Sequence, residues 1–167
     1  MGYGIINIKN KNIELITMGV LNLSKYTNHP LKLKKIFERT LGLITEYKPD
    51  ELAIEAPFYG KNIQSMLKLG RAQGVAMAAA LYREIPIFEY SPKKIKQSIT
   101  GRGNSSKEQV ATMLYNLLSK KVEISQLDAT DALAAAVCHY FQKNNQNQGS
   151  KYSGWKAYLS NNPDKIR

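Results

Sequence analysis

The chain has 167 residues, with 24 Lys and Arg against 13 Asp and Glu and a formal net charge of +11. This length favours one domain with its own core, and the single cysteine excludes a disulfide framework or a Cys-rich zinc module. No apolar run approaches the roughly 20 residues that span a bilayer, and no signal peptide opens the chain, so we expect a cytoplasmic protein without membrane contact. The basic charge predicts a polyanionic partner, with nucleic acid as the first candidate.

The first half of the chain predicts strands and helices in alternation. β-Branched residues are typical of the first two strands, and a polar turn over residues 9–12 separates them. The first helix shows apolar residues at i, i+3 and i+4 spacing. The second helix is rich in small residues from Gly70 to Ala80, which allows a close approach by another helix of this chain or of a dimer partner. The expected elements are strands over 3–8 and 13–23, a helix over 30–47, a strand over 51–55 and a helix over 62–84.

The second half predicts one more strand and two more helices. A strand is expected over 85–90, and Ser105 and Glu108 have the spacing of a capping box before an apolar run through Leu118. An Ala-rich helix follows over 127–141. We therefore expect an α/β domain over 1–141, followed over 142–167 by a polar linker and a basic, aromatic tail.

The charge is distributed unevenly along the chain. Residues 93–121 carry seven basic and one acidic side chain, whereas residues 122–141 carry three acidic and no basic ones. Most such runs are solvated surfaces. The alternative is a surface that follows a phosphate backbone beside a cluster of carboxylates, as a metal-dependent nuclease requires.

Three carboxylates are candidates for that cluster. Glu55 ends a buried strand, so its side chain is expected at the edge of the sheet, and Asp128 and Asp131 share one face of a helix. Acids in a first helical turn are commonly caps and dipole partners, which is the simpler interpretation of the two Asp residues. Hard oxygen ligands without His or Cys favour Mg²⁺ or Mn²⁺ over zinc.

Several segments in the correct order resemble the RuvC family of Holliday junction resolvases. The resemblance covers residues 2 to about 141. The segments are Ala53-Ile54-Glu55-Ala56-Pro57-Phe58, Leu67-Lys68-Leu69-Gly70-Arg71-Ala72-Gln73-Gly74, Ile87-Phe88-Glu89-Tyr90-Ser91-Pro92, Gly101-Arg102-Gly103, Ser106-Lys107-Glu108-Gln109-Val110 and Asp128-Ala129-Thr130-Asp131-Ala132-Leu133-Ala134.

This resemblance implies an RNase H-like fold, in which a mixed β-sheet is flanked by helices. It implies a homodimer that cuts opposed strands of four-way junction DNA during recombination and repair, and a RuvA–RuvB branch-migration complex as partner. Two Mg²⁺ ions per site are implied, with Mn²⁺ as a possible substitute, and the products would carry a 5′-phosphate and a 3′-hydroxyl.

The resemblance also implies roles for individual residues. Glu55, Asp128 and Asp131 match three of four metal ligands, and Lys96 and Lys107 match catalytic lysines that act on the scissile phosphate. The expected DNA-binding residues are Phe58, Lys61, Arg71, Lys96, Arg102 and Lys107. The simpler alternative for Phe58 is core packing, and for the lysines it is solvation. His139 and Cys138 are expected to be packed in the core.

One part of the family pattern is missing. The family begins with a strand and an Ile-Asp-Pro-Gly turn whose Asp is the first metal ligand, whereas this chain opens with Met1-Gly2-Tyr3-Gly4, which matches the segment after that turn. The missing piece would be roughly 10–20 residues. An internal Met taken as the start, a shortened chain or a non-catalytic relative would each explain it. We favour the first and expect the longer protein to be active and the 167-residue chain to be inactive or impaired.

Two other functions are open at this stage. One is a non-catalytic protein that binds branched DNA, which would keep Phe58 and the lysines without needing Glu55, Asp128 and Asp131. The other is an RNase H-like nuclease that acts on structured RNA.

Overall fold

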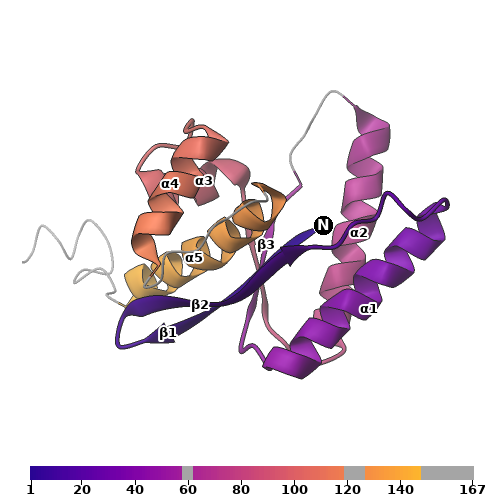
Figure 1. Ribbon diagram of the computed structural model, residues 1–167, viewed down its shortest axis with the longest axis horizontal. Helices are drawn as coiled ribbons and strands as arrows, with labels where there is room; N and C mark the ends of the chain where they lie inside the picture. Colours follow the sequence, from indigo (N-terminus) through magenta and orange to yellow (C-terminus); the bar gives the residue numbers. More distant parts are fainter. Residues whose placement is uncertain (58–61, 119–126, 148–167) are drawn as a thin grey trace, which may run out of the picture.

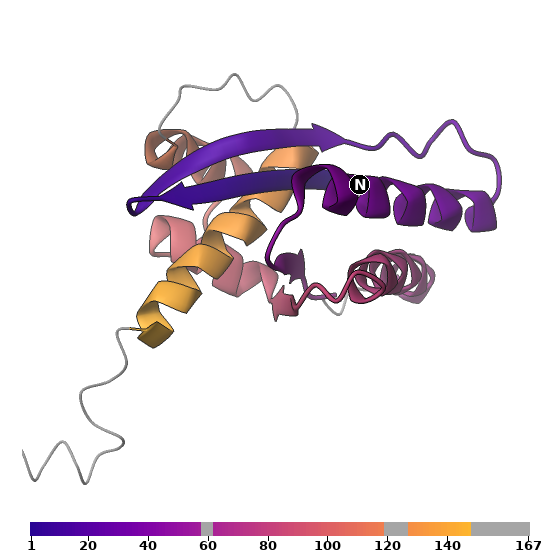
Figure 2. The ribbon, with the colours of Figure 1, turned by 90° about the horizontal axis from the view of Figure 1, so that it is seen from below.

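The computed structural model describes residues 1–57, 62–118 and 127–147 (Figure 1), so Phe58, Lys61 and the tail from residue 148 lie outside the described residues. Helices α3, α4 and α5 gather on one side of the strands, and α1 and α2 lie side by side on the other (Figures 1 and 2). None of the described helices is long and apolar enough to cross a membrane. The elements are β1 (Gly2–Lys9), β2 (Asn12–Val20), α1 (His29–Tyr47), β3 (Leu52–Glu55), α2 (Ile63–Leu81), β4 (Ile87–Tyr90), α3 (Pro92–Thr100), α4 (Lys107–Leu117) and α5 (Leu127–Asn147).

The first two strands form an antiparallel hairpin, as predicted. Its turn residues Asn10 and Lys11 have φ values of 52° and 66°, which is the left-handed geometry of a two-residue turn matched to the twist of the strands. The register shifts between Ile5 and Ile6, which leaves Ile16 as the extra residue of a β-bulge. β2 ends at Val20, earlier than the expected end at residue 23.

The other two strands form a parallel pair in which Glu55 lies opposite Tyr90. Within the described residues, this pair and the hairpin are two separate two-stranded sheets. Helix α5 packs against β1, β2 and β3, so it joins both sheets into one body. The structure therefore has the expected mixture of parallel and antiparallel pairing flanked by helices.

Helix α5 is the centre of the main core. Leu133, Val137 and Cys138 have no exposed surface, and they pack with Leu114 of α4 and the isoleucines of α3. Strand β1 approaches this helix closely at Gly4, where a Cβ atom would lie 3.1 Å from Leu133 Cα. The helix that the apolar run over 127–141 predicted therefore lies at the centre of the hydrophobic core.

Helices α1 and α2 form a separate layer. The side chains of Asn28 and Asn62 accept hydrogen bonds from Leu31 N and Ser65 N, which caps both helices at their starts. α2 ends at Leu81, before the expected end at residue 84. A Cβ atom added at Gly70 or Gly74 would meet nothing within 4 Å, so these two glycines do not serve packing within the described chain.

Three local features differ from expectation. Helix α3 was not predicted; Ser91 caps it and Pro92 opens it, a position where proline costs no hydrogen bond. The capping box at α4 joins Ser106 and Gln109, so the prediction of Ser105 and Glu108 was wrong by one residue. Helix α5 continues to Asn147, past the expected end at Phe141, and includes the start of the segment predicted to be a linker.

Candidate active site

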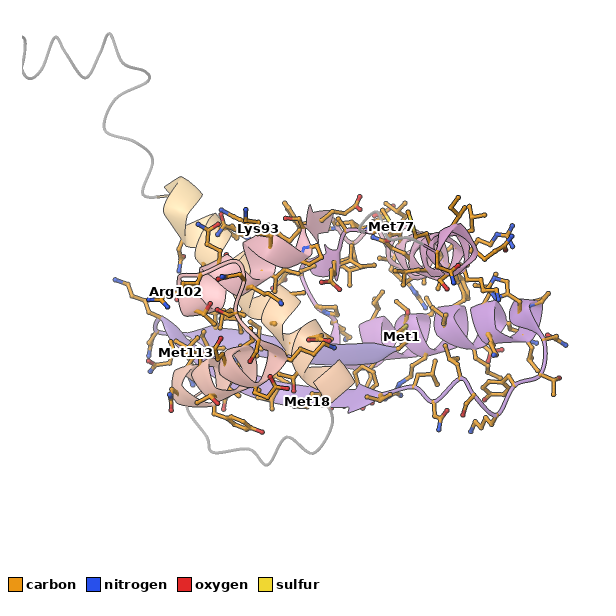
Figure 3. The ribbon with its side chains drawn as sticks, turned by 90° about the horizontal axis from the view of Figure 1, so that it is seen from above. Met1, Met18, Met77, Lys93, Arg102 and Met113 are labelled. Atoms are coloured by element: carbon orange, nitrogen blue, oxygen red, sulfur yellow. The ribbon has the colours of Figure 1, made fainter. Side chains whose placement is uncertain are left out.

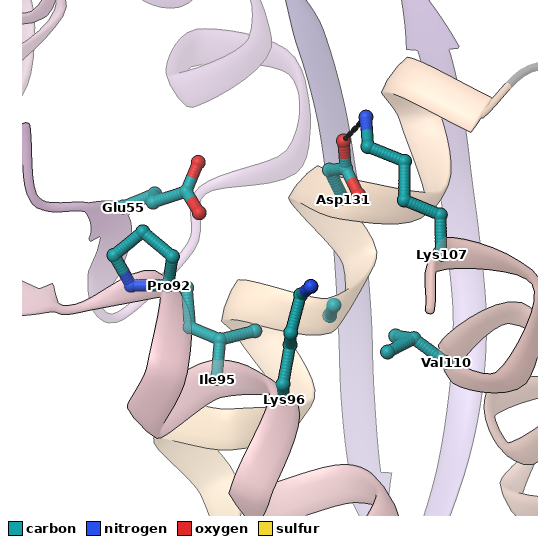
Figure 4. Close-up of a pocket in the computed structure, with 8 residues that line it drawn as sticks. Glu55, Pro92, Ile95, Lys96, Lys107, Val110 and Asp131 are labelled. Atoms are coloured by element: carbon teal, nitrogen blue, oxygen red, sulfur yellow. Dashed lines mark hydrogen bonds and ion pairs between the residues drawn. The ribbon is translucent and has the colours of Figure 1, made fainter. Parts of the chain in front are cut away.

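A cavity of about 240 Å³ lies where the end of β3 meets α3, α4 and α5. Two acids and two lysines face it, above an apolar base formed by side chains of the three helices (Figure 4). The lining residues are Glu55, Pro92, Ile95, Lys96, Lys107, Val110, Asp131 and Ala134. Four of the residues expected to be catalytic, which are spread over 77 positions of the sequence, thus share one site.

Glu55 reaches the cavity because it is the last residue of a short strand. Its side chain is exposed, yet its surroundings withdraw part of the hydration of its carboxylate. This loss of hydration raises the pKa of Glu55, and the negative charge of Asp131 raises it further, against the opposing effect of Lys107 and Lys96. The two carboxylates therefore repel one another, and a cation between them would offset this repulsion.

Asp131 and Lys107 face one another across the cavity. Lys107 Nζ donates to Asp131 Oδ2 at 2.8 Å, and both side chains are about half exposed (Figure 4). Lys107 is the first residue of α4, directly after the Ser106 cap, and Asp131 lies at the start of α5. Asp128 is on α5 one turn before Asp131, as predicted, but its side chain lies outside the described residues.

The turn between α3 and α4 holds the two lysines of the site in relation to one another. Thr100 Oγ1 lies 2.8 Å from the carbonyl oxygen of Lys96 and 2.7 Å from the Ser105 hydroxyl. Ser105 in turn donates to the carbonyl oxygen of Arg102 at 3.0 Å. Ser105, expected to be a helix cap, is a buried tie within this turn instead. Sequence reasoning missed this role because nothing in the spacing distinguishes Ser105 from Ser106.

The other expected DNA contacts are only partly placed. Arg71 is exposed on α2, and Arg102 is exposed in the α3–α4 turn, where Figure 3 labels it near Lys93. The Lys93 side chain packs over Gly103, since a Cβ atom there would lie 2.5 Å from Lys93 Cγ. Arg102 thus lies on the same helical side of the molecule as the cavity, whereas Arg71 belongs to the layer of α1 and α2.

The core residues of α5 behave as expected. Cys138 is fully buried, with its Sγ 3.2 Å from the Ser98 hydroxyl. His139 is packed against Phe88, with ring centroids 4.4 Å apart, and both of its nitrogens have hydrogen-bond partners. Neither residue reaches the cavity. The partners of His139 could not be predicted from the sequence.

The donor set suits a hard divalent cation in part. Among residues whose side chains the structure describes, no three His, Cys, Asp or Glu groups form a metal cluster. Glu55 and Asp131 supply two carboxylates to one cavity, and Asp128, the third expected ligand, lies three residues before Asp131 on α5. Carboxylate oxygens without imidazole or thiolate are the ligands that Mg²⁺ and Mn²⁺ prefer.

Known proteins resemble this chain in both sequence and structure. Residues 1–139 match the family model for crossover junction endodeoxyribonuclease RuvC. The protein of that name from Cytophaga hutchinsonii is 60% identical over 167 residues, which are 100% of this chain and 82% of the relative. The one from Porphyromonas gingivalis is 57% identical over 172 residues and is covered over 91% of its length.

Solved structures show the same relationship. A structure of Thermus thermophilus RuvC in complex with a Holliday junction substrate has a TM-score of 0.79 and 28% identity, over 85% of this chain and 87% of that one. A second T. thermophilus RuvC structure has a TM-score of 0.75 and 27% identity, over 86% of this chain and 88% of that one. The RNase H-like fold expected from the sequence motifs is thereby confirmed.

Proposed function

The chain belongs to the RuvC family of crossover junction endodeoxyribonucleases, and we propose that the cavity between β3, α3, α4 and α5 is its phosphodiester-cleaving centre. Its activity is that of a Holliday junction resolvase in recombination and DNA repair. The observation that carries the proposal for the site is the convergence of Glu55 and Asp131 with Lys96 and Lys107 in one cavity. Carboxylates that hold metal beside cations that face phosphate are what hydrolysis of a charged backbone requires.

The family is metal-dependent, and we propose that Glu55, Asp128 and Asp131 hold two Mg²⁺ ions, which Mn²⁺ could replace. When bound, such ions activate water and stabilise the leaving oxygen of a phosphodiester. The raised pKa of Glu55 supports this assignment. Loss of hydration and the negative charge of Asp131 both disfavour the ionised carboxylate of Glu55, and a bound cation would offset both effects. The nicks that this cleavage leaves would carry a 5′-phosphate and a 3′-hydroxyl.

The two lysines are proposed to act on the scissile phosphate. Lys96 and Lys107 come from two helices and line the same cavity as the carboxylates (Figure 4). Lys107 lies in the first turn of α4, where unpaired backbone N–H groups also favour an anion. A positive charge on two sides of the cavity would hold the phosphate and offset the charge that builds up during cleavage.

DNA outside the cavity is proposed to contact aromatic and basic side chains. Phe58 would stack on a base exposed at the crossover, an interaction worth roughly 1–3 kcal/mol, and Lys61 would contact the nearby backbone. Arg71 and Arg102, both exposed, would contact phosphates of the arms. For Phe58 we expect that alanine impairs cleavage more than junction binding.

A homodimer is proposed, with the outer face of α2 as its seam. Exposed apolar side chains and open glycines lie along α2 at helical spacing, and they leave room for close approach by a second helix. These residues are Ile63, Leu67, Gly70, Gly74 and Leu81. A dimer would place two cavities on one four-way junction, as paired cleavage requires. Leu67→Glu should convert the dimer to a monomer in light scattering, with Lys68→Glu, on an adjacent face, as the control.

Two further assignments rest on family membership. We propose a RuvA–RuvB branch-migration complex as partner and the cytoplasm, where the chromosomal DNA lies, as the place of action. The T. thermophilus relative was solved with a Holliday junction substrate, and we propose four-way junction DNA as the substrate of this chain.

The proposal for the site is tested by cleavage and binding of a four-way junction at one fixed salt concentration, because salt alone shifts affinity strongly. In a form of the protein that cleaves the junction, Glu55→Gln should abolish Mg²⁺-dependent cleavage while leaving junction affinity nearly unchanged, since the basic surface supplies that affinity. Glu46→Gln, an exposed acid on α1, is the matched control. Cleavage by Glu55→Gln at the rate of the parent would contradict the proposal. Equal affinity for linear duplex and junction would favour a general nucleic-acid-binding function instead.

A further inference from the structure

Hydrogen bonds among the side chains of Glu51, His139 and Tyr90 join β3, β4 and α5 outside the cavity. His139 of α5 makes a hydrogen bond with each of its two ring nitrogens. Its Nε2 lies 2.8 Å from Glu51 Oε2, and its Nδ1 lies 2.7 Å from the Tyr90 hydroxyl. Glu51 directly precedes β3, and Tyr90 ends β4. These side-chain hydrogen bonds therefore connect α5 to both strands of the parallel pair, β3 and β4.

The hydrogen bonds among Glu51, His139 and Tyr90 are partly shielded from water. The side chains of His139 and Glu51 are 12% and 22% exposed, and the Phe88 ring covers the imidazole at a centroid distance of 4.4 Å. Hydrogen bonds in such surroundings are stronger than at the surface and costly to leave unmade. At the outer end, Lys143 Nζ contacts both carboxylate oxygens of Glu51 at 2.8 Å, with its own side chain half exposed.

The spacing of these contacts relates them to the cavity. Glu51 and Glu55 are four residues apart on an extended segment, a rise of about 13 Å. His139 and Asp131 are eight residues apart on a helix, a rise of about 12 Å. Since β3 and α5 are in contact and Glu55 and Asp131 share a cavity, the two elements run in opposite directions with matched lengths. The contact between Glu51 and His139 thus holds β3 against α5 at one end, and Glu55 and Asp131 lie at the other end of the same two elements.

Tyr90 adds a second connection to the same pair. It is the register partner of Glu55 in the parallel ladder, and its hydroxyl reaches His139 on α5. Burial raises the pKa of Tyr90, which keeps its hydroxyl protonated as a donor at neutral pH. A displacement of α5 along β3 would therefore break both bonds of His139 at once.

We propose that Glu51, His139 and Tyr90 are positioning residues that set the separation between Glu55 and Asp131. They touch neither substrate nor metal, and they act through the placement of α5 against β3. This proposal rests on the function proposed for the cavity. It predicts that loss of these hydrogen bonds makes the separation between Glu55 and Asp131 more variable, although both carboxylates remain.

The test compares two Tyr→Phe variants that each remove one hydroxyl. Tyr90→Phe removes the bond to His139, whereas Tyr140→Phe removes the bond from α5 to the carbonyl oxygen of Lys11 at the hairpin turn. Backbone hydrogen exchange at residues 54–55 and 129–132 is the first readout, because it reports the docking of β3 and α5 in any form of the chain. Tyr90→Phe and His139→Leu should raise exchange there, and Tyr140→Phe should not. Unchanged exchange in both Tyr90→Phe and His139→Leu would overturn the proposal.

Cleavage kinetics of the four-way junction, measured in a form of the protein that cleaves it, are the second readout. Tyr90→Phe should lower kcat roughly 10- to 100-fold, with KM nearly unchanged, because a misplacement of about 1 Å between catalytic groups has that effect. His139→Gln, which can keep a bond to Glu51, should retain more activity than His139→Leu although both change the imidazole. Raised exchange at the carboxylates with unchanged kcat would also overturn the proposal. Loss of cleavage in Glu55→Gln tests the function of the cavity separately, so the two failures can be distinguished.

Discussion

Lys107 Nζ lies 2.8 Å from Asp131 Oδ2 and joins the start of α4 to the start of α5 across the cavity. The side chains are 52% and 44% exposed, so water screens much of their attraction. Exposed ion pairs contribute about 0–1 kcal/mol to stability. The pair is therefore suited to a chemical role that can be removed without unfolding the protein.

The first prediction follows from that exposure. In a form of the protein that cleaves the junction, Asp131→Asn and Lys107→Met should each lower cleavage roughly 100-fold or more, since each removes a charge from the centre where charge develops. The free energy of unfolding in urea should change by less than about 1 kcal/mol in both variants. Asp50→Asn, an exposed acid outside the cavity, is the control. A parallel loss of stability and activity in Asp131→Asn would show that Asp131 acts as a helix-capping acid rather than a ligand.

The second prediction concerns the start of α4. Ser106 Oγ accepts from Gln109 N, and Gln109 Oε1 accepts from Ser106 N at 2.9 Å. Ser106→Ala should lower the free energy of unfolding by about 1 kcal/mol, whereas Ser106→Asp should keep most of it. Both values follow from urea denaturation curves. Equal stability of Ser106→Ala and the parent would contradict the capping box in this register.

Ser105 provides the contrast to that experiment. Its hydroxyl is buried between Thr100 and the carbonyl oxygen of Arg102. Ser105→Asp should therefore be more destabilising than Ser105→Ala, because a buried charge without a cationic partner costs more than a lost hydroxyl. A cap at Ser105 would give the opposite order.

The third prediction concerns the contact between β1 and α5. A Cβ atom at Gly4 would lie 3.1 Å from Leu133 Cα and 3.2 Å from Leu133 N, and backbone atoms of a packed helix cannot turn aside. Gly4→Ala should lower the free energy of unfolding by about 1–3 kcal/mol, as overpacking does. Gly42→Ala, where a Cβ atom would meet nothing within 4 Å, is the matched control. A stable Gly4→Ala protein would mean that β1 lies farther from α5 than the structure shows.

The sequence predicted the elements well where one local pattern dominates. The apolar periodicity of α1, the polar turn at Asn10 and Lys11, and the strand that ends at Glu55 were all confirmed. Helix α3 was not predicted, although Pro92 stands at its start, where a proline costs no hydrogen bond. The end of α5 was misplaced because composition predicted a linker, whereas the helix continues past Phe141, and Lys143 on its extension contacts Glu51.

The residues of the candidate site could be predicted from the sequence, but the side-chain contacts that position them could not. Glu55, Asp131, Lys96 and Lys107 were named from residue type and family motif, and the structure places all four in one cavity. The chain through Glu51, His139 and Tyr90 could not be predicted, because its members are 88 and 49 positions apart and only the docking of α5 brings them together.

The fourth prediction concerns acid stability and Glu51. The hydrogen bond with Lys143 lowers the pKa of Glu51, burial raises it in part, and the hydrogen bond with His139 lowers it again, so that the pKa lies below its ordinary value. The other group facing this cluster is the Tyr90 hydroxyl of β4, which bonds His139. A carboxyl whose folded pKa is lowered stabilises the fold above its unfolded pKa, and this contribution is lost as pH falls through the folded pKa.

Glu51→Gln should therefore lower the free energy of unfolding at neutral pH by about 1.5–3 kcal/mol, the range for hydrogen bonds to charged groups. As the pH falls below the ordinary glutamate range, the parent should lose this advantage and its stability should converge on that of Glu51→Gln. Urea denaturation at a series of pH values measures both curves, with Asp50→Asn as the control. Parallel curves that never converge would show that Glu51 acts by shape alone, without its charge.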